Sequence, residues 1–264
     1  MLLFGVAFFR SFPALMRRHL LTVDKAVTRI TDKLCRNVTV VIDDIKYQLM
    51  DYESLILVSH EHYEMAFMPL WLKPRKGEIL IDMGAHIGKY TLTAAKAVTE
   101  KGLVVAVEPH STNYQTLQKN IQINGLTNVK TLNIAAWNTN TKLELYTVAE
   151  NKASMYSTKI RGPDYLEVNA QTMDSALKEL HLPRLDWIKI DVEGAEVEAL
   201  QGLDETITQY TPKLIIEVLQ VNLNEIRKIL KKHDYSLIRI TPWFIFYGSA
   251  RIFCVPTPEE TPPK

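Results

Sequence analysis

The sequence predicts an α/β fold in which short apolar strands alternate with helices around one mostly parallel sheet. From residue 79 to residue 233, short apolar runs are followed by helix-compatible stretches of mixed polarity. Two apolar runs near the C-terminus, 235–240 and 251–255, follow each other with no helix between them. Two such strands pair antiparallel, so the sheet should close with an antiparallel hairpin.

Length and composition fit one such domain with additions. The chain has 264 residues, a formal net charge of +1 and two cysteines. Two cysteines without a Cys-x-x-Cys spacing predict a reducing compartment, and the charge gives no general reason to expect nucleic acid as a partner. Residues 1–40 are the exception, because they hold seven Lys or Arg residues against two Asp.

Residues 1–72 are predicted to form an N-terminal extension. A stripe of apolar side chains predicts an amphipathic helix over 13–36, and strands 38–42 and 45–50 should pair as a hairpin. Two interpretations of the helix stay open. It covers the core or pairs with another subunit in a homodimer, or residues 1–36 lie on a membrane surface with the basic face toward the lipid. The apolar run at the start is too short to span a membrane.

Residues 73–256 form the predicted ligand-binding domain, and the proline-rich residues 257–264 a disordered tail. A helix over 111–123 should stop at Asn124-Gly125, and a polar loop over 150–164 is long enough to serve the substrate. The other predicted strands are 79–81, 103–107, 129–134, 142–146, 168–171, 185–190 and 213–218, and the other helices are a run ending at 97, 173–180, 196–210 and 222–233.

The cofactor turn, residues 82–88, is the stretch that organises this domain. A strand ends at Asp82, Gly84 and Gly88 follow, and a helix then begins. Glycines allow a ligand to approach the backbone, and the first turn of a helix presents free N–H groups and a positive dipole end. Alone, this pattern is equally typical of a helix cap and a turn. Together with a further acid it predicts a nucleotide-type site.

That further acid is Glu108, which ends the next strand twenty residues after Gly88. An acid at this place is typical of a group that binds ribose hydroxyls. The turn lacks the middle glycine of Gly-x-Gly-x-x-Gly, which lets a pyrophosphate approach, so a cofactor without phosphates is favoured. S-adenosylmethionine (SAM) fits, since it offers an ammonium group and a ribose diol. The pattern and the closing hairpin argue against a nicotinamide-binding dehydrogenase.

Asp191 ends the strand 185–190 and is the predicted general base or acceptor anchor. In the alternative it only caps the helix that begins near Ala195. Glu193 follows as a second acid that fixes the loop, and His86 is an alternative base. A divalent ion held by Asp191 and Glu217 is a further alternative, although the sequence shows no third ligand.

Four stretches of the chain are similar to the FkbM-type SAM-dependent methyltransferases, and together they are specific. They are 81–91, 107–120, 135–138 and 188–196. The resemblance implies a seven-stranded, Rossmann-like SAM-binding fold and methylation of a hydroxyl group. It implies cofactor contacts from these stretches and places Asp191 and Glu193 at the methyl-transfer end. The expected cofactor contacts are Asp82, Gly84, His86, Gly88, Tyr90, Thr91, Glu108, Asn113, Ala135 and Asp191.

The expected function is therefore transfer of a methyl group from SAM to a hydroxyl of a small molecule, a sugar or a lipid-linked glycan. His86 departs from the asparagine that the family commonly has, which leaves its role open. Two other classes remain, an RNA base methyltransferase and a non-catalytic nucleotide-binding domain. The expected location is the cytoplasm, with the inner membrane face as the alternative that the N-terminal helix suggests.

Overall fold

The computed structural model describes residues 30–59, 72–147, 156–159, 162, 164–239 and 249–257. Its centre is a seven-stranded sheet in the order β12-β13-β11-β10-β3-β4-β5. β13 pairs antiparallel with both β12 and β11, and all other neighbours in the sheet pair parallel, which confirms the predicted sheet and closing hairpin. The strands are β3 (Ile79–Met83), β4 (Leu103–Val107), β5 (Val129–Leu132), β10 (Trp187–Ile190), β11 (Lys213–Leu219), β12 (Tyr235–Arg239) and β13 (Ser249–Pro256).

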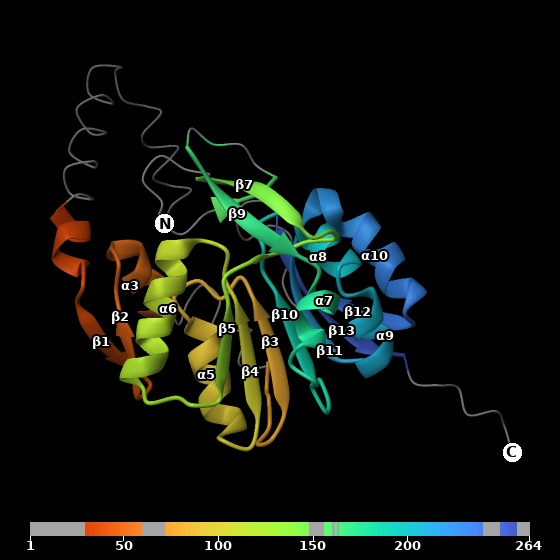
Figure 1. The fold of residues 1–264 in the computed structure, drawn as a ribbon, viewed down its shortest axis with the longest axis horizontal. Helices are drawn as coiled ribbons and strands as arrows, with labels where there is room; N and C mark the ends of the chain where they lie inside the picture. Colours follow the sequence, from red (N-terminus) through yellow and green to blue (C-terminus); the bar gives the residue numbers. More distant parts are fainter. Residues whose placement is uncertain are drawn as a thin grey trace, which may run out of the picture.

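Helices cover both faces of this sheet (Figure 1). Every residue of β3 and β10 is buried, as expected of central parallel strands. On one face, Leu80 and Ile215 pack with Ala94 of α5 (Lys89–Val98). On the other, Ile81 and Ile188 pack with helices that include α7 (Met173–Lys178), α8 (Glu196–Gln201), α9 (Asp204–Tyr210) and α10 (Leu223–Lys232).

A second sheet lies at the carboxyl end of the parallel strands (Figure 1). Its order is β6-β9-β7-β8, formed by Ala135–Ala136, Tyr165–Gln171, Thr141–Thr147 and Tyr156–Ser157. The sequence predicted β7 and the end of β9 as separate strands but did not predict this sheet. The polar stretch 150–164 was treated as one loop, whereas residues 156–157 pair with β7. The other residues of that stretch lie largely outside the described ranges.

The predicted N-terminal hairpin is confirmed. β1 (Thr39–Ile42) pairs antiparallel with β2 (Ile45–Gln48), and both turn residues between them have positive φ. Tyr47 of β2 packs in one cluster with Val58 of α3 (Tyr52–Ser59) and Leu92 of α5. The hairpin thus shares a core with the sheet domain, and the proposed division at residue 72 stays a prediction.

Other predictions fall mostly on residues outside the described ranges. Of the predicted helix 13–36, only residues 30–36 are described, and of these 30–35 are helical. Most of residues 1–36, on which the membrane-surface interpretation depends, and most of the tail 257–264 lie outside the described ranges. Within the described ranges, none of the helices combines the length and the apolar character needed to cross a bilayer.

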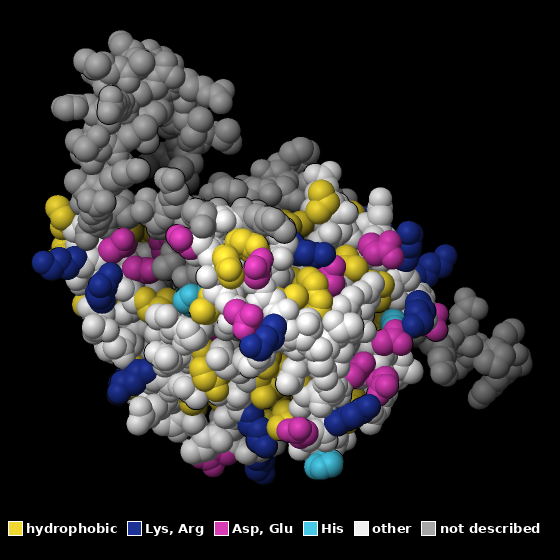
Figure 2. Space-filling model, turned by 45° about the horizontal axis from the view of Figure 1, so that its top comes forward, with side chains coloured by type: hydrophobic (Ala, Val, Ile, Leu, Met, Phe, Trp, Pro, Cys, Tyr) yellow, Lys and Arg dark blue, Asp and Glu magenta, His cyan; other side chains and the backbone are white. Residues whose placement is uncertain are grey.

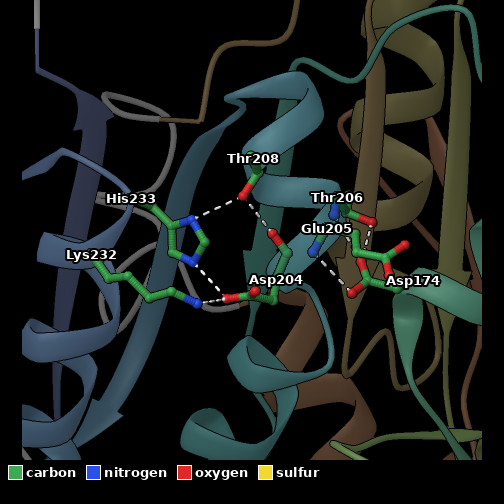
Figure 3. A network of polar contacts seen from close by, with 7 residues as sticks. All are labelled: Asp174, Asp204, Glu205, Thr206, Thr208, Lys232 and His233. Carbon is green, nitrogen blue, oxygen red and sulfur yellow. Dashed lines mark hydrogen bonds and ion pairs between the residues drawn. The ribbon is translucent and has the colours of Figure 1, made fainter.

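One predicted helix is wrong. The stretch 196–210 forms α8 and α9, separated at Gly202 and Leu203. A Cβ at Gly202 would lie 2.0 Å from the carbonyl oxygen of Trp137, so the backbones of these two segments are in contact. Asp174, which lies on α7, caps the start of α9, because its carboxylate accepts the backbone N–H groups of Glu205 and Thr206 at 3.0 and 2.8 Å (Figure 3).

A second group of polar contacts ties α9 to the end of α10 (Figure 3). Asp204, at the start of α9, accepts from Lys232 at 2.6 Å and contacts the Nε2 atom of His233 at 2.9 Å. The hydrogen bond from Lys232 lowers the pKa of Asp204. Negative charge at a helix start and positive charge at a helix end both complement the helix dipoles, so these contacts fix the two helices on the sheet.

Candidate active site

The cofactor turn joins β3 to α5 in a left-handed backbone conformation. Gly84, His86 and Gly88 have φ values of +78°, +51° and +102°. The backbone N–H groups of Gly84 and Ala85 both donate to the carbonyl oxygen of Val107, at 2.9 and 3.0 Å. The turn is therefore fastened to the end of the neighbouring strand β4, as the strand-turn-helix prediction requires.

The reason for Gly84 differs from the expected one. We expected glycine to leave room for a ligand, but an added Cβ would lie 1.8 Å from the backbone oxygen of Asp191. A Cβ at Gly88 would lie 2.8 Å from the Cδ1 atom of Leu117, on α6 (Ser111–Ile123). Contact with the Asp191 backbone thus requires glycine at 84, and at 88 the φ of +102° together with the Leu117 side chain disfavours a larger residue.

Glu108 lies directly after β4 and fixes the other side of the turn. Its carboxylate accepts the backbone N–H groups of His86 and His110 at 2.8 and 2.9 Å, and the amide of Asn113 lies 3.4 Å away. Only 5% of its surface is exposed. Burial, opposed by these hydrogen bonds, raises the pKa of Glu108 to about 7.

Asp82 is fully buried at the end of β3. One carboxylate oxygen accepts the hydroxyl of Thr91 at 2.6 Å, and the other lies 3.1 Å from the Nζ atom of Lys189. The predicted cofactor residues Asp82 and Thr91 are therefore brought together, and their hydrogen bond joins β3 to α5 on the two sides of the turn. Direct contact of either with a cofactor stays a prediction.

Lys189 is the residue that sequence reasoning missed. It lies opposite Asp82 in the pairing of β10 with β3 and is itself buried. Its Nζ atom also lies 3.4 Å from the carbonyl oxygen of Gly84, 3.5 Å from the carboxylate of Asp191 and 5.0 Å from the ring centroid of Tyr90. The available signal was a lysine inside the apolar run Trp187–Ile190, since a buried strand lysine needs a carboxylate partner.

Asp191 follows β10 and stands beside the cofactor turn. Its backbone N–H donates to the carbonyl oxygen of Met83 at 3.1 Å, and its side chain is 24% exposed. The helix-cap alternative for Asp191 is wrong, because α8 begins after Ala195 and has no side-chain cap. Of the three acids at these strand ends, Asp191 is the one that solvent reaches.

The chain after Asp191 is held in an uncommon conformation. Glu193 and Gly194 have φ values of +49° and +102°. The Ser157 hydroxyl donates to the carbonyl oxygen of Glu193 at 2.6 Å, and the buried Glu196 carboxylate accepts the N–H of Gly194 at 2.7 Å. Asn222 donates to the carbonyl oxygen of Gly194 at 3.0 Å. Sequence reasoning assigned the loop-fixing role to Glu193 and missed these three side chains.

The remaining predictions for the site concern the other cofactor contacts and a divalent ion. Ala135 is buried on β6 in a small core with Leu145, Val168 and Ala170. Its cofactor contact stays a prediction, as do those of Tyr90 and Asn113. For the alternative of a divalent ion, the described part of the chain gathers no group of three or more His, Cys, Asp or Glu side chains that could hold one.

The fold and this site define a class of protein. A glycine turn after the first parallel strand, an acid after the second and an antiparallel closing pair are the features of a Rossmann-like methyltransferase. The methyltransferase FkbM domain model matches residues 82–237, which is more than half of the chain. The chain belongs to this family of methyltransferases.

Individual relatives are distant. Methyltransferase sdnD of Sordaria araneosa is 25% identical over 210 residues, covering 67% of this chain and 78% of that protein. Methyltransferase 1 of Beauveria bassiana is 22% identical over 159 residues, covering 53% of this chain and 64% of its own. Among solved structures, the fibrillarin pre-rRNA processing protein of Methanococcus jannaschii shares the fold with a TM-score of 0.50 at 10% identity, over 83% of this chain and 82% of its own.

Proposed function

We propose that this methyltransferase transfers a methyl group from SAM to a hydroxyl of a small molecule, a sugar or a lipid-linked glycan. One observation carries the proposal. Gly84 of the cofactor turn lies against the backbone of Asp191, so the acid that is more exposed than Asp82 and Glu108 stands next to the turn that would hold the cofactor. Any acceptor reaching the turn would meet this carboxylate.

The residues of the turn fit SAM. Glu108 offers a carboxylate at the strand end where ribose hydroxyls bind in folds of this type. Beside it, the Oδ1 atom of Asn113 is buried and makes no hydrogen bond of ordinary geometry among the described residues, with the His110 side chain as its polar neighbour. Because a buried polar atom without a partner costs free energy, this atom supports a ligand that donates a hydrogen bond, such as a hydroxyl or an amino group.

SAM supplies a methyl group on a positively charged sulfur, and the sulfur becomes neutral when the methyl group leaves. The chain's task is to align the acceptor oxygen, exclude water and receive the hydroxyl proton. Asp191 is suited to receive that proton because its carboxylate is accessible beside the turn. Asp82 and Glu108 are suited to binding and bracing, since both are buried and already accept hydrogen bonds or ion pairs.

A small or sugar-like acceptor is favoured by the surface near the carboxyl ends of the strands. Where Figure 2 draws described residues on this face, Lys and Arg side chains are interspersed with Asp and Glu and form no continuous basic area. Nucleic acid is usually bound through such an area. Tyr165 of the second sheet is 61% exposed, with its ring 5.6 Å from that of Tyr146, and exposed aromatic rings are suited to stack on sugar faces.

Titration calorimetry with SAM and NAD⁺, followed by a transfer assay with methyl-labelled SAM, tests the proposal. The acceptor panel should contain free sugars, a lipid-linked sugar, phenols, carboxylic acids and tRNA. We expect SAM to bind, NAD⁺ not to bind and the label to appear on a hydroxyl oxygen. Absence of SAM binding would contradict the proposal, and label on a tRNA base would replace it with the RNA alternative.

Glu108→Ala locates the binding site in the same experiment. Loss of a charge-assisted hydrogen bond should weaken SAM binding by roughly 1.5–3 kcal/mol, which is about 10- to 150-fold in the dissociation constant. Glu167→Ala is a matched control, because Glu167 lies on β9 and pairs with the exposed Lys142. Equal SAM affinity in wild type and Glu108→Ala would show that the cofactor binds elsewhere.

A further inference from the structure

One buried ammonium group joins the cofactor turn to the exposed acid. The Nζ atom of Lys189 lies 3.1 Å from Asp82 and 3.5 Å from Asp191, and it donates to the carbonyl oxygen of Gly84 at 3.4 Å. The side chains of Lys189 and Asp82 are 4% and 0% exposed, against 24% for Asp191. Asp82 and Asp191 thus share the Lys189 cation, and these three residues together carry a formal charge of −1.

This arrangement differs from an ordinary surface ion pair. Two carboxylates that lie near each other without a cation cannot both stay charged at low cost, and one of them takes up a proton. A cation between them stabilises the negative charge on both. Because Asp82 is inaccessible, the charge that an incoming ligand meets is that of Asp191.

We propose that Lys189 is a positioning residue, which holds the Asp191 carboxylate beside the cofactor turn so that it faces the sulfonium of SAM. The proposal rests on the proposed function, since it requires SAM to bind at the cofactor turn. A negative charge beside the sulfur favours SAM, which is positively charged there, over the product, which is neutral. A site that gained or lost a proton near neutral pH would alter the binding of SAM relative to that of its product.

Other titratable groups surround this cluster. Burial raises the pKa of Glu196 on α8, and the nearby Asp191 contributes to the rise. Burial likewise raises the pKa of Glu108, after β4, to about 7. A useful test must distinguish a change of charge on these groups from a change of charge on Asp191. Glu108 interacts with Asp82, Glu196 interacts with Asp191, and the Tyr90 ring lies against both Lys89 and Lys189.

SAM and S-adenosylhomocysteine provide this separation without any acceptor. The two differ at the sulfur, where SAM is charged and the product neutral, and they share the ribose and adenine. Titration of a group that binds the shared parts alters both affinities alike, so it cancels in their ratio. The ratio of the two dissociation constants, measured by calorimetry between about pH 6 and about pH 8, therefore reports the charge that faces the sulfur.

For wild type we expect a ratio that is constant over this range. In Lys189→Met the two carboxylates lose their cation, so the preference for SAM should fall by about three- to tenfold on acidification from pH 8 to pH 6. Adding Asp191→Asn to Lys189→Met should make the ratio constant again, because Lys189 acts through Asp191. Lys213→Met is the matched control, since Lys213 begins the neighbouring strand β11 and is exposed.

Two measurements keep the test decisive if Lys189→Met does not fold. Wild type must show the constant ratio, and Asp191→Asn, which leaves the Asp82 ion pair in place, must lower the preference for SAM severalfold at every pH. A wild-type ratio that varies with pH, or an unchanged ratio in Asp191→Asn or in folded Lys189→Met, overturns the proposal. Failure of wild type to bind either ligand contradicts the proposed function itself, which is a distinguishable result.

Discussion

Gly84 and Asp191 touch through their backbones where β3 and β10 end side by side. A Cβ at Gly84 would lie 1.8 Å from the Asp191 carbonyl oxygen, and the φ of +78° is unfavourable for any other residue. Gly84→Ala should therefore lower the free energy of unfolding by roughly 2–4 kcal/mol, measured by urea denaturation.

Gly125→Ala is the control for Gly84→Ala. Gly125 has a φ of +65°, but nothing lies within 4 Å of the position that a Cβ would take. Its replacement should cost only the backbone strain of about 1–2 kcal/mol. Equal losses in the two variants would show that the contact with Asp191 adds nothing to stability.

Glu108 should make the stability of the protein depend on pH in an unusual direction. Its pKa in the folded protein is about 7, above the value of 4.5 for the free group. The folded state therefore holds this proton longer than the unfolded chain does. The free energy of unfolding should be highest below about pH 4.5 and fall as the pH rises through about 7.

Glu108→Gln tests this direction, because an amide has no carboxyl proton to lose. The difference in unfolding free energy between wild type and Glu108→Gln should change by up to about 3 kcal/mol between pH 5 and pH 8, wild type becoming relatively weaker at the higher pH. Urea denaturation at four pH values would show it. Parallel curves for the two proteins would contradict the assignment.

Asp191→Asn should separate chemistry from stability. An amide cannot accept the acceptor's proton, so turnover should fall by something like 10²–10⁴-fold once an acceptor is available. Melting temperature should barely change in Asp191→Asn, because Asp191 does not cap α8 and Lys189 keeps its ion pair with Asp82. Full turnover in Asp191→Asn would move the role of base to His86.

Asp174 should stabilise α9, the second of the two helices that form where the sequence predicts one. Its carboxylate accepts two backbone N–H groups of α9 and the Thr206 hydroxyl (Figure 3). Asp174→Ala should cost about 1–2 kcal/mol of unfolding free energy, whereas Asp174→Asn should retain part of the cap. Identical stabilities of the Ala and Asn variants would show that capping is not its contribution.

The sequence was most informative where local patterns determine structure. The helix Ser111–Ile123 has the predicted ends because Asn124-Gly125 stops it, and the hairpin β1-β2 follows from alternating apolar residues. Contacts between distant segments were not predictable in this way. The division between α8 and α9 depends on Trp137, which is far from Gly202 in the chain.

In the candidate site, too, local patterns were informative and contacts between distant segments were not predictable. Asp82, Glu108 and Asp191 could be found because each acid ends an apolar run. Lys189 was missed because its partner is set by strand register, which no local pattern reveals. The short strands β6 and β8 were missed because two residues are too few to show periodicity, and only pairing with β7 and β9 defines them.

The hairpin and α6 meet in a way that fixes their relative register. Asn124 exchanges hydrogen bonds with the backbone of Lys46, and Asn120 accepts the N–H of Gln48 while donating to the carbonyl oxygen of Ile87 in the cofactor turn. Four residues of helix rise about 6 Å and two residues of strand about 6.8 Å. The two spacings are similar, so both asparagines can bond the strand at the same time. A slip of β2 by one residue would break the hydrogen bonds of both asparagines and turn Tyr47 out of its core. A shift of the hairpin would also displace Asn120, which bonds the cofactor turn at Ile87.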